Sequence, residues 1–121
     1  MARILITEDD SQVRGMLRLT LEREGHEIVE AGDGREALRR CAEGPVDIVV
    51  TDLIMPEMEG IEFIRRLRRM RPEVKIIAMS GGGYIGPQSY LDTARKCGAS
   101  YAFSKPVDRA TLLDAIRQLA A

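Results

Sequence analysis

The chain has 121 residues, of which 45% are hydrophobic and 31% charged, and its 18 basic and 19 acidic side chains leave a formal net charge of -1. A chain of this length can bury one hydrophobic core, so we expect a single domain over residues 1–121. The composition is that of a soluble globular protein and excludes a fibrous, disordered or membrane-spanning chain. The balanced charge provides no overall field for binding nucleic acid or a membrane surface.

The amino terminus and the cysteines indicate where the protein resides. No apolar stretch near the amino terminus is long enough for a signal peptide, so we expect a cytoplasmic protein. Cys41 and Cys97 are far apart and lie among apolar, helix-spaced neighbours, which is typical of reduced structural thiols in a reducing compartment. With a single histidine in the chain, a zinc site is not expected.

Short apolar runs alternate with longer segments of helical periodicity along the whole chain. The runs are rich in β-branched residues and predict five strands, at 4–7, 27–31, 48–51, 74–79 and 99–103. The apolar stripes that follow them predict five helices, over 13–21, 37–42, 61–67, 90–97 and 112–120. Three glycines, Gly25, Gly44 and Gly98, fall just past predicted helix ends, where a left-handed residue is favoured, and Asp108 can cap the last helix.

The third predicted strand contains the unbroken apolar run Ile48-Val49-Val50. Such a run indicates a strand covered on both faces, which a parallel sheet between two helix layers provides. Five βα units with right-handed crossovers then favour an α/β fold, a flavodoxin-like doubly wound five-stranded parallel sheet with strand order 2-1-3-4-5 and helices on both faces.

Polar residues follow four of the predicted strands. In a sheet of this kind, ligands bind at the carboxyl ends of the strands, near the point where the strand order reverses. Acids crowded there repel one another unless a cation neutralises them, and carboxylate oxygens suit Mg²⁺, with Mn²⁺ as an alternative. The residues expected at this edge are Glu8, Asp9 and Asp10, then Asp52, Ser80 and Lys105.

Asp52 is the best candidate nucleophile in this set. Its carboxylate can attack phosphorus to give an acyl phosphate, while Lys105 and the hydroxyl of Ser80 stabilise charge on the phosphoryl group. Any one acid could instead be a loop residue or a helix cap, and we keep that interpretation for Asp10. Capping does not explain a lysine and a serine at matching strand ends.

Four segments together resemble the receiver domain of two-component response regulators, and the similarity covers essentially the whole chain. The resemblance implies that Asp52 accepts a phosphoryl group from a histidine of a sensor kinase or of a histidine phosphotransfer protein. It also implies that phosphorylation changes a surface of the fourth helix, fifth strand and fifth helix, which binds a downstream protein. The segments are Ile4-Leu5-Ile6-Thr7-Glu8-Asp9-Asp10, Thr51-Asp52-Leu53-Ile54-Met55-Pro56-Glu57-Met58-Glu59-Gly60, Ile76-Ile77-Ala78-Met79-Ser80-Gly81 and Ser104-Lys105-Pro106.

The same resemblance implies roles for the remaining site residues. Asp9 and Asp52 would bind Mg²⁺ directly, Glu8 would do so through water, and the backbone carbonyl of Ile54 would be a further ligand. Ser80 and Lys105 would contact the phosphoryl oxygens, and Lys105 could pair with Asp52 when the site is empty.

Three positions depart from the family pattern. Glu8 replaces the commoner aspartate, and Ala102 stands where many receivers have an aromatic residue that turns inward on phosphorylation. Tyr101 is one residue earlier, on the opposite face of its strand, so we expect a switch other than the usual serine–aromatic one. The segment from Ser80 to Gly98 is about three residues longer than the family leads us to expect.

That longer segment contains Gly81-Gly82-Gly83-Tyr84-Ile85-Gly86, which matches G-x-G-x-x-G. It falls in the fourth βα unit and lacks an acid about 20 residues later, so a dinucleotide site is disfavoured. Our hypothesis is that this loop and the fourth helix are the moving element in place of the missing aromatic residue.

Two further features concern the surface of the third helix and the lifetime of the phosphoryl group on Asp52. An arginine run on the third helix, residues 65–71, is interpreted as a solvated face, with docking of an acidic partner as the alternative. Neither Ile54 nor Gly82 can hold an attacking water, which predicts slow self-dephosphorylation that Ile54→Asn or Gly82→Glu would accelerate.

Two rival functions remain open from the sequence. An aspartyl-nucleophile phosphatase would need an acid two residues after the nucleophile, where Ile54 stands, and a flavin- or nucleotide-binding module would use the glycine-rich loop. The leading interpretation is a signalling phosphoacceptor that catalyses only its own phosphorylation and dephosphorylation, binds neither nucleic acid nor membrane, and has no output domain after the fifth helix.

Overall fold

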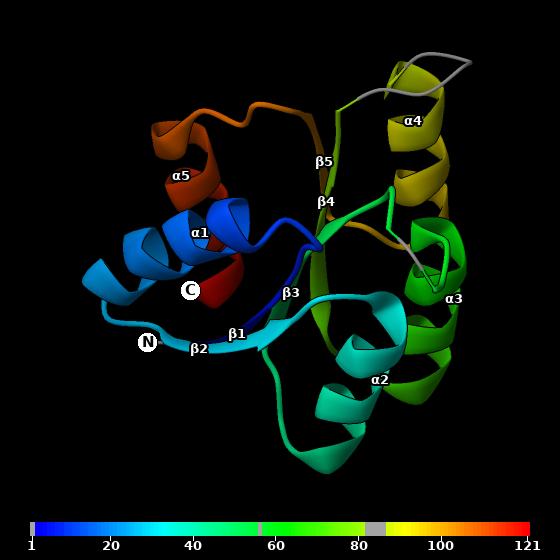
Figure 1. Ribbon diagram of the computed structural model, residues 1–121, viewed down its shortest axis with the longest axis horizontal. Helices are drawn as coiled ribbons and strands as arrows, with labels where there is room; N and C mark the ends of the chain where they lie inside the picture. The colour runs from blue at the N-terminus through cyan, green and yellow to red at the C-terminus, as the bar shows by residue number, and fades with distance from the viewer. Residues whose placement is uncertain (1, 56, 82–86) are drawn as a thin grey trace.

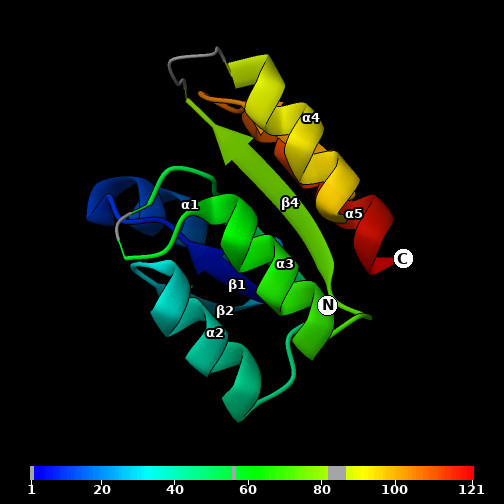
Figure 2. The same ribbon diagram turned by 90° about the vertical axis from the view of Figure 1, so that its right-hand side faces the viewer.

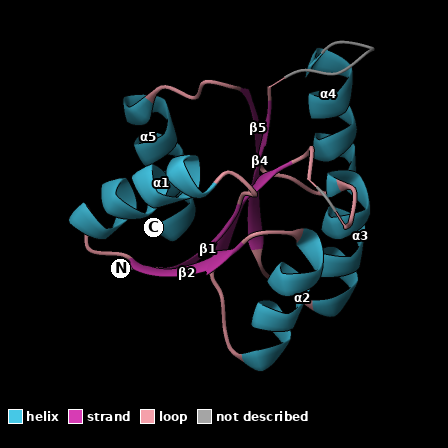
Figure 3. Cartoon of the chain, in the orientation of Figure 1, coloured by secondary structure: helices cyan, strands magenta, loops and turns pink. Residues whose placement is uncertain are grey.

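Strands and helices alternate along the chain, as expected. The computed structural model describes residues 2–55, 57–81 and 87–121, and only the backbone for 87–90. Figure 1 and Figure 3 show the five βα units. In chain order they are β1 (Arg3–Thr7), α1 (Ser11–Arg23), β2 (Glu27–Ala31), α2 (Gly34–Glu43), β3 (Ile48–Asp52), α3 (Gly60–Met70), β4 (Lys75–Ser80), α4 (Pro87–Cys97), β5 (Tyr101–Ser104) and α5 (Arg109–Ala120).

The sheet has the predicted topology. Its order is β2-β1-β3-β4-β5, with every neighbouring pair parallel. The strand order therefore reverses between β1 and β3, whose last paired residues are Thr7 and Thr51. The doubly wound α/β fold is confirmed.

Helices cover both faces of the sheet. Helices α1 and α5 lie on one face, and α2, α3 and α4 lie on the other (Figure 1, Figure 2). Alternate residues of each strand serve the two cores: Leu5 packs on the side of α2 and α3, whereas Ile4 and Ile6 pack on the side of α1 and α5. All five residues of β3 are buried, as the unbroken apolar run predicts.

The helix ends agree with the sequence at three of four positions. Gly25 and Gly98 have the left-handed φ values of 89° and 123°, and Asp108 caps α5 by accepting a hydrogen bond from the Thr111 amide. The prediction for Gly44 is wrong, because its φ of -165° is extended. The next residue is Pro45, and a residue before proline is driven to extended backbone.

The last strand is shorter than predicted. It begins at Tyr101 rather than at residue 99, because the Ala99 amide still donates to the Ala94 carbonyl at the end of α4. Its side chains divide as expected: Ala102 packs on the side of α3 and α4, and the rings of Tyr101 and Phe103 stack on the other side, 5.7 Å apart. The face toward α4 thus has no aromatic residue from β5.

The arginine run on α3 has two roles. Arg65, Arg66 and Arg69 are exposed, as predicted for a solvated face. Arg68 instead donates to the carbonyls of Pro72, Val74 and Gly98 at 2.6, 2.8 and 2.8 Å. Arg68 therefore connects the end of α3 to the chain just before β4 and just after α4. The charge pattern alone did not predict this role.

Both cysteines are free, and Cys41 is buried whereas Cys97 is half-buried. Burial raises the pKa of the Cys41 thiol to about 11. At pH 8 only about one Cys41 thiol in a thousand is then the reactive thiolate. We expect Ellman's reagent to modify Cys97 in the folded protein and Cys41 only on unfolding. A Cys97→Ser variant that still reacts rapidly when folded would contradict this.

Two sequence-based predictions lie outside the described residues: the hypothesis of a moving glycine-rich loop, which depends on residues 82–86, and the role of Gly82 in phosphoryl lifetime. None of the helices in the described part of the chain has the length and apolar character needed to cross a bilayer.

Candidate functional site

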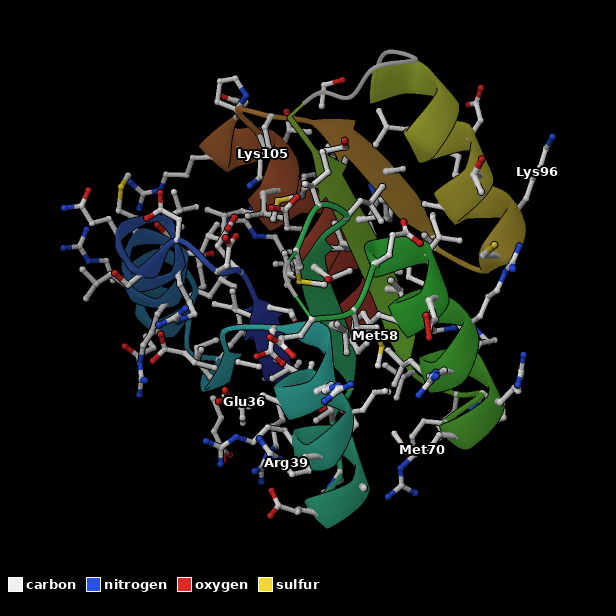
Figure 4. The ribbon with its side chains drawn as sticks, turned by 45° about the vertical axis from the view of Figure 1, so that its right-hand side comes forward. Glu36, Arg39, Met58, Met70, Lys96 and Lys105 are labelled. Atoms are coloured by element: carbon white, nitrogen blue, oxygen red, sulfur yellow. The ribbon has the colours of Figure 1, made fainter. Side chains whose placement is uncertain are left out.

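The carboxyl edge of the sheet collects the predicted polar residues from four segments. Asp52 is the last residue of β3, and Ser80 is the last residue of β4. Glu8 and Asp9 follow β1, and Lys105, which is labelled in Figure 4, follows β5. The convergence follows from the parallel order, since all these strands end at the same edge.

Lys105 joins two of the acids. Its Nζ lies 2.6 Å from Glu8 Oε1 and 3.1 Å from Asp52 Oδ2. The Glu8 side chain is only 1% exposed, whereas that of Lys105 is 26% exposed. The pairing of Lys105 with Asp52 is the one that the family resemblance implies. The shorter contact with Glu8 was not predicted, although the greater length of glutamate over aspartate is the signal that could have indicated it.

Backbone amides hold the other carboxylate oxygens. The Asp10 amide donates to Glu8 Oε2 at 3.2 Å, and the Ile54 amide donates to Asp52 Oδ1 at 3.3 Å. Each buried acid therefore has one oxygen on Lys105 and one on a backbone amide of its own loop. This arrangement satisfies carboxylates that would otherwise be costly to bury.

Asp10 has the separate role expected of it. Its Oδ1 accepts hydrogen bonds from the amides of Gln12 and Val13 at 2.9 and 3.2 Å. It is the N-cap of α1, so the interpretation as a helix cap is confirmed.

Ser80 is fully buried at the end of β4, where it pairs in the sheet with Ser104, the residue before Lys105. Its carbonyl accepts a hydrogen bond from the Lys105 amide at 3.0 Å. The ends of β4 and β5 thereby bring the hydroxyl-bearing residue and the lysine to the same edge.

Burial and the neighbouring charges shift the pKa values of Glu8 and Lys105. Burial raises the pKa of the Glu8 carboxyl above its usual value, although the hydrogen bonds from Lys105 and the Asp10 amide oppose this. Burial alone would lower the pKa of Lys105, but its hydrogen bonds to Glu8 and Asp52 and the charges of these acids outweigh it, so this pKa is raised. The lysine therefore stays charged.

The acids form a group suited to a cation. One oxygen from each of Glu8, Asp9 and Asp52 lies within 4.8 Å of the other two. Ligand oxygens around Mg²⁺ are separated by roughly 3 to 4 Å, so small side-chain movements bring these into range. Three carboxylates and one lysine carry a net charge of about -2, which one divalent cation neutralises. The oxygen donors and the charge both fit such an ion.

A groove of about 400 Å³ opens beside Lys105. It is mainly apolar and runs between α1 and the chain that follows β5. Met16 at its border is 69% exposed. The lining residues are Val13, Met16, Leu17, Met79, Gly81, Lys105, Pro106 and Val107.

Arg14 is a further residue that the sequence analysis did not single out. Its Nη1 donates to the backbone carbonyl of Glu8 at 2.6 Å. The available signal was its position four residues after the N-cap Asp10, which directs a long basic side chain back toward the loop.

Replacing Lys105 tests the charge balance. In Lys105→Met the buried acids lose the ammonium group that neutralises them. Without metal, we expect the free energy of unfolding to fall by about 1 to 2 kcal/mol, allowing for the partial exposure of the lysine. The loss is largest at neutral pH and shrinks as the pH falls through the raised pKa of Glu8, because protonation removes the unpaired charge. Millimolar Mg²⁺ should restore more stability to this variant than to the parent.

Urea unfolding with and without MgCl₂ measures both effects. Lys96→Met is the matched control, because Lys96 is exposed on α4, away from the site (Figure 4). Equal stability of the two variants in the absence of metal would contradict the expectation.

Fold and site together define a class: a doubly wound α/β protein with a group of carboxylates suited to a cation, and a lysine, at the switch point of its sheet. Residues 4–117 match the family model of the response regulator receiver domain. The chain belongs to the response regulator receiver domain family.

Characterised relatives support this assignment. The chain is 35% identical to the chemotaxis protein CheY of Thermotoga maritima over 118 residues, which cover 97% of this chain and 96% of that protein. It is 33% identical to the response regulator receiver protein CpdR of Brucella abortus, with 98% and 97% covered. It spans only 24% of the transcriptional regulator NtrC of Azospirillum brasilense, at 34% identity.

Solved structures agree. A receiver domain protein from Clostridium thermocellum superposes with a TM-score of 0.91 at 30% identity, covering 98% of this chain and 94% of that one. The response regulator TrrA of Thermotoga maritima, solved in complex with Mg²⁺ and BeF, gives a TM-score of 0.86 at 28% identity, with 98% and 99% covered. The rival phosphatase and flavin- or nucleotide-binding interpretations are not favoured.

Proposed function

We propose that this receiver domain accepts a phosphoryl group on Asp52 in a Mg²⁺-dependent reaction with a phosphohistidine. The observation that carries the proposal is the placement of the Asp52 carboxylate between two further acids and Lys105 at one sheet edge. Asp9 and Asp52 would bind Mg²⁺ directly, with Glu8 through water and the Ile54 carbonyl as a further ligand.

In the reaction, an oxygen of Asp52 attacks the phosphorus atom of the donor. The O–P bond forms as the P–N bond breaks, and the imidazole of the donor leaves with the electron pair. Bound Mg²⁺ would neutralise charge on the phosphoryl oxygens. Lys105 leaves its contacts with Glu8 and Asp52 to donate to a phosphoryl oxygen, and the hydroxyl of Ser80 donates to another.

We propose that the donor is a sensor histidine kinase or a histidine phosphotransfer protein. Sequence relatives include the sensor kinase CckA of Brucella abortus, which is 45% identical over 83 residues that cover 66% of this chain and 9% of that protein. The apolar groove beside Lys105 supports this, since a protein donor that reaches Asp52 can bury its own apolar residues there. The downstream target would bind the face of α4, β5 and α5, and the protein would act in the cytoplasm.

Acetyl phosphate tests the proposal. Incubation with acetyl phosphate and Mg²⁺ should add one phosphoryl group to the chain by intact mass, and EDTA should prevent it. An unmodified chain under these conditions, or equal modification in EDTA, would refute the proposal.

The lifetime of the phosphoryl group should depend on Ile54, which is 49% exposed at the mouth of the site. Its apolar side chain holds no water against phosphorus, so we expect slow self-dephosphorylation. Ile54→Asn adds an amide that can orient water, and the decay rate should rise about tenfold, the equivalent of one good hydrogen bond. Ile54→Val is the control and should decay like the parent. An equal decay rate in all three chains would contradict the role of this position.

A further inference from the structure

A side chain of helix α1 contacts the backbone of the loop that holds Glu8 and Asp9. The Glu8 amide extends the sheet by donating to the Ala31 carbonyl at 3.1 Å. Its carbonyl accepts instead from Arg14 Nη1, which lies one turn into α1, at 2.6 Å. Glu8 is thus the residue at which the chain changes from strand pairing to contact with α1.

The contacted carbonyl belongs to the peptide unit between the two acids. That unit is planar, so its orientation depends only on ψ of Glu8 and φ of Asp9. Fixing the carbonyl oxygen therefore restrains both dihedrals, and with them the directions in which both carboxylates leave the backbone. The single contact from Arg14 therefore acts on both acids at once.

Arg14 is itself held in place. Its Nε lies 3.2 Å from Glu30 Oε1 on β2. The other carboxylate oxygen of Glu30 pairs with Arg18, one turn further along α1, and Arg18 also pairs with Glu22 at 3.1 Å. The guanidinium of Arg14 uses two different edges, one for the Glu30 carboxylate and one for the Glu8 carbonyl, as the fork of donors in arginine allows.

We propose that Arg14 is a positioning residue for the metal centre, orienting Glu8 and Asp9 for a divalent cation that it does not touch. The inference rests on the proposed Mg²⁺-dependent function. Mg²⁺ requires near-ideal octahedral geometry, so its affinity is sensitive to how well its ligands are oriented before it binds. Loss of such outer contacts typically weakens metal binding about 10- to 100-fold.

Calorimetric titration with Mg²⁺ alone, without phosphodonor, tests the inference. Arg14→Gln should raise the Kd for Mg²⁺ by about tenfold. Arg18→Gln is the matched control, because this substitution also removes an ion pair to Glu30. Arg18 makes no contact with the Glu8 carbonyl, so the Kd of this variant for Mg²⁺ should equal that of the parent. Arg14→Lys keeps the charge but not the fork, and should show an intermediate Kd.

The outcomes separate the claims. A parent chain that binds no Mg²⁺ would refute the proposed function and this inference with it. If the parent binds Mg²⁺ and Arg14→Gln binds it with equal affinity, the inference alone is overturned. It is also overturned if Arg18→Gln weakens Mg²⁺ binding as much as Arg14→Gln does, because the effect would then come from a general loss of stability. If Arg14→Gln does not fold, an unchanged Kd in Arg14→Lys overturns it.

Discussion

Asp52→Asn should carry no phosphoryl group after incubation with acetyl phosphate and Mg²⁺, whereas the parent chain is modified. Asparagine has nearly the same shape, and its side-chain oxygen can still accept the hydrogen bond from the Ile54 amide, so the fold is preserved. The asparagine amide is not a nucleophile, and one of the two acids proposed to bind Mg²⁺ directly is lost. We therefore expect complete loss of the adduct by intact mass, and weaker Mg²⁺ binding by calorimetry.

The matched control is another acid of the same edge. Asp10 follows Glu8 and Asp9 directly in the sequence, but it serves as the N-cap of α1. Asparagine caps helices as well as aspartate does, so Asp10→Asn should leave both stability and phosphorylation unchanged. If Asp52→Asn is modified as fully as the parent, the acceptor is a different residue. If Asp10→Asn prevents modification, the division of roles within the acidic loop is wrong.

The arrangement of the fold could be predicted from the sequence because it depends on patterns of many residues. The run Ile48-Val49-Val50 identifies a strand covered on both faces, and the order β2-β1-β3-β4-β5 follows from five successive βα units. The position of the site could be predicted for the same reason. Once Asp52 and Ser80 are at the ends of parallel strands, their common edge follows from topology.

Contacts between individual side chains could not be predicted in the same way. The sequence indicates that Lys105 lies near the acids, but the shorter contact to Glu8 depends on the length of that side chain and on where β5 ends. The position of Arg14 on α1 directs its side chain toward the loop, but neither periodicity nor charge pattern specifies the Glu8 carbonyl as the acceptor of its hydrogen bond. Gly44 shows the same limit, since its neighbour Pro45 decided its conformation.

Gly60→Ala should destabilise the protein by about 3 kcal/mol or more, through the close approach of α3 to the chain just after Asp52. Gly60 begins α3, and its amide donates to the Leu53 carbonyl at 3.0 Å. A Cβ atom there would lie 2.4 Å from Leu53 Cα and 2.5 Å from its carbonyl oxygen. Both are backbone atoms, so no rotamer change relieves the overlap.

The control is another helical glycine with open surroundings. Gly15 lies within α1, and a Cβ there would meet nothing within 4 Å. Alanine is favoured over glycine inside a helix, so Gly15→Ala should raise the free energy of unfolding in urea by about 0.5 to 1 kcal/mol. Because Leu53 follows Asp52 directly, the displacement in Gly60→Ala should also weaken Mg²⁺ binding, whereas Gly15→Ala should not. Equal stability of the two variants would mean that α3 does not pack against the end of β3 as closely as the structure has it.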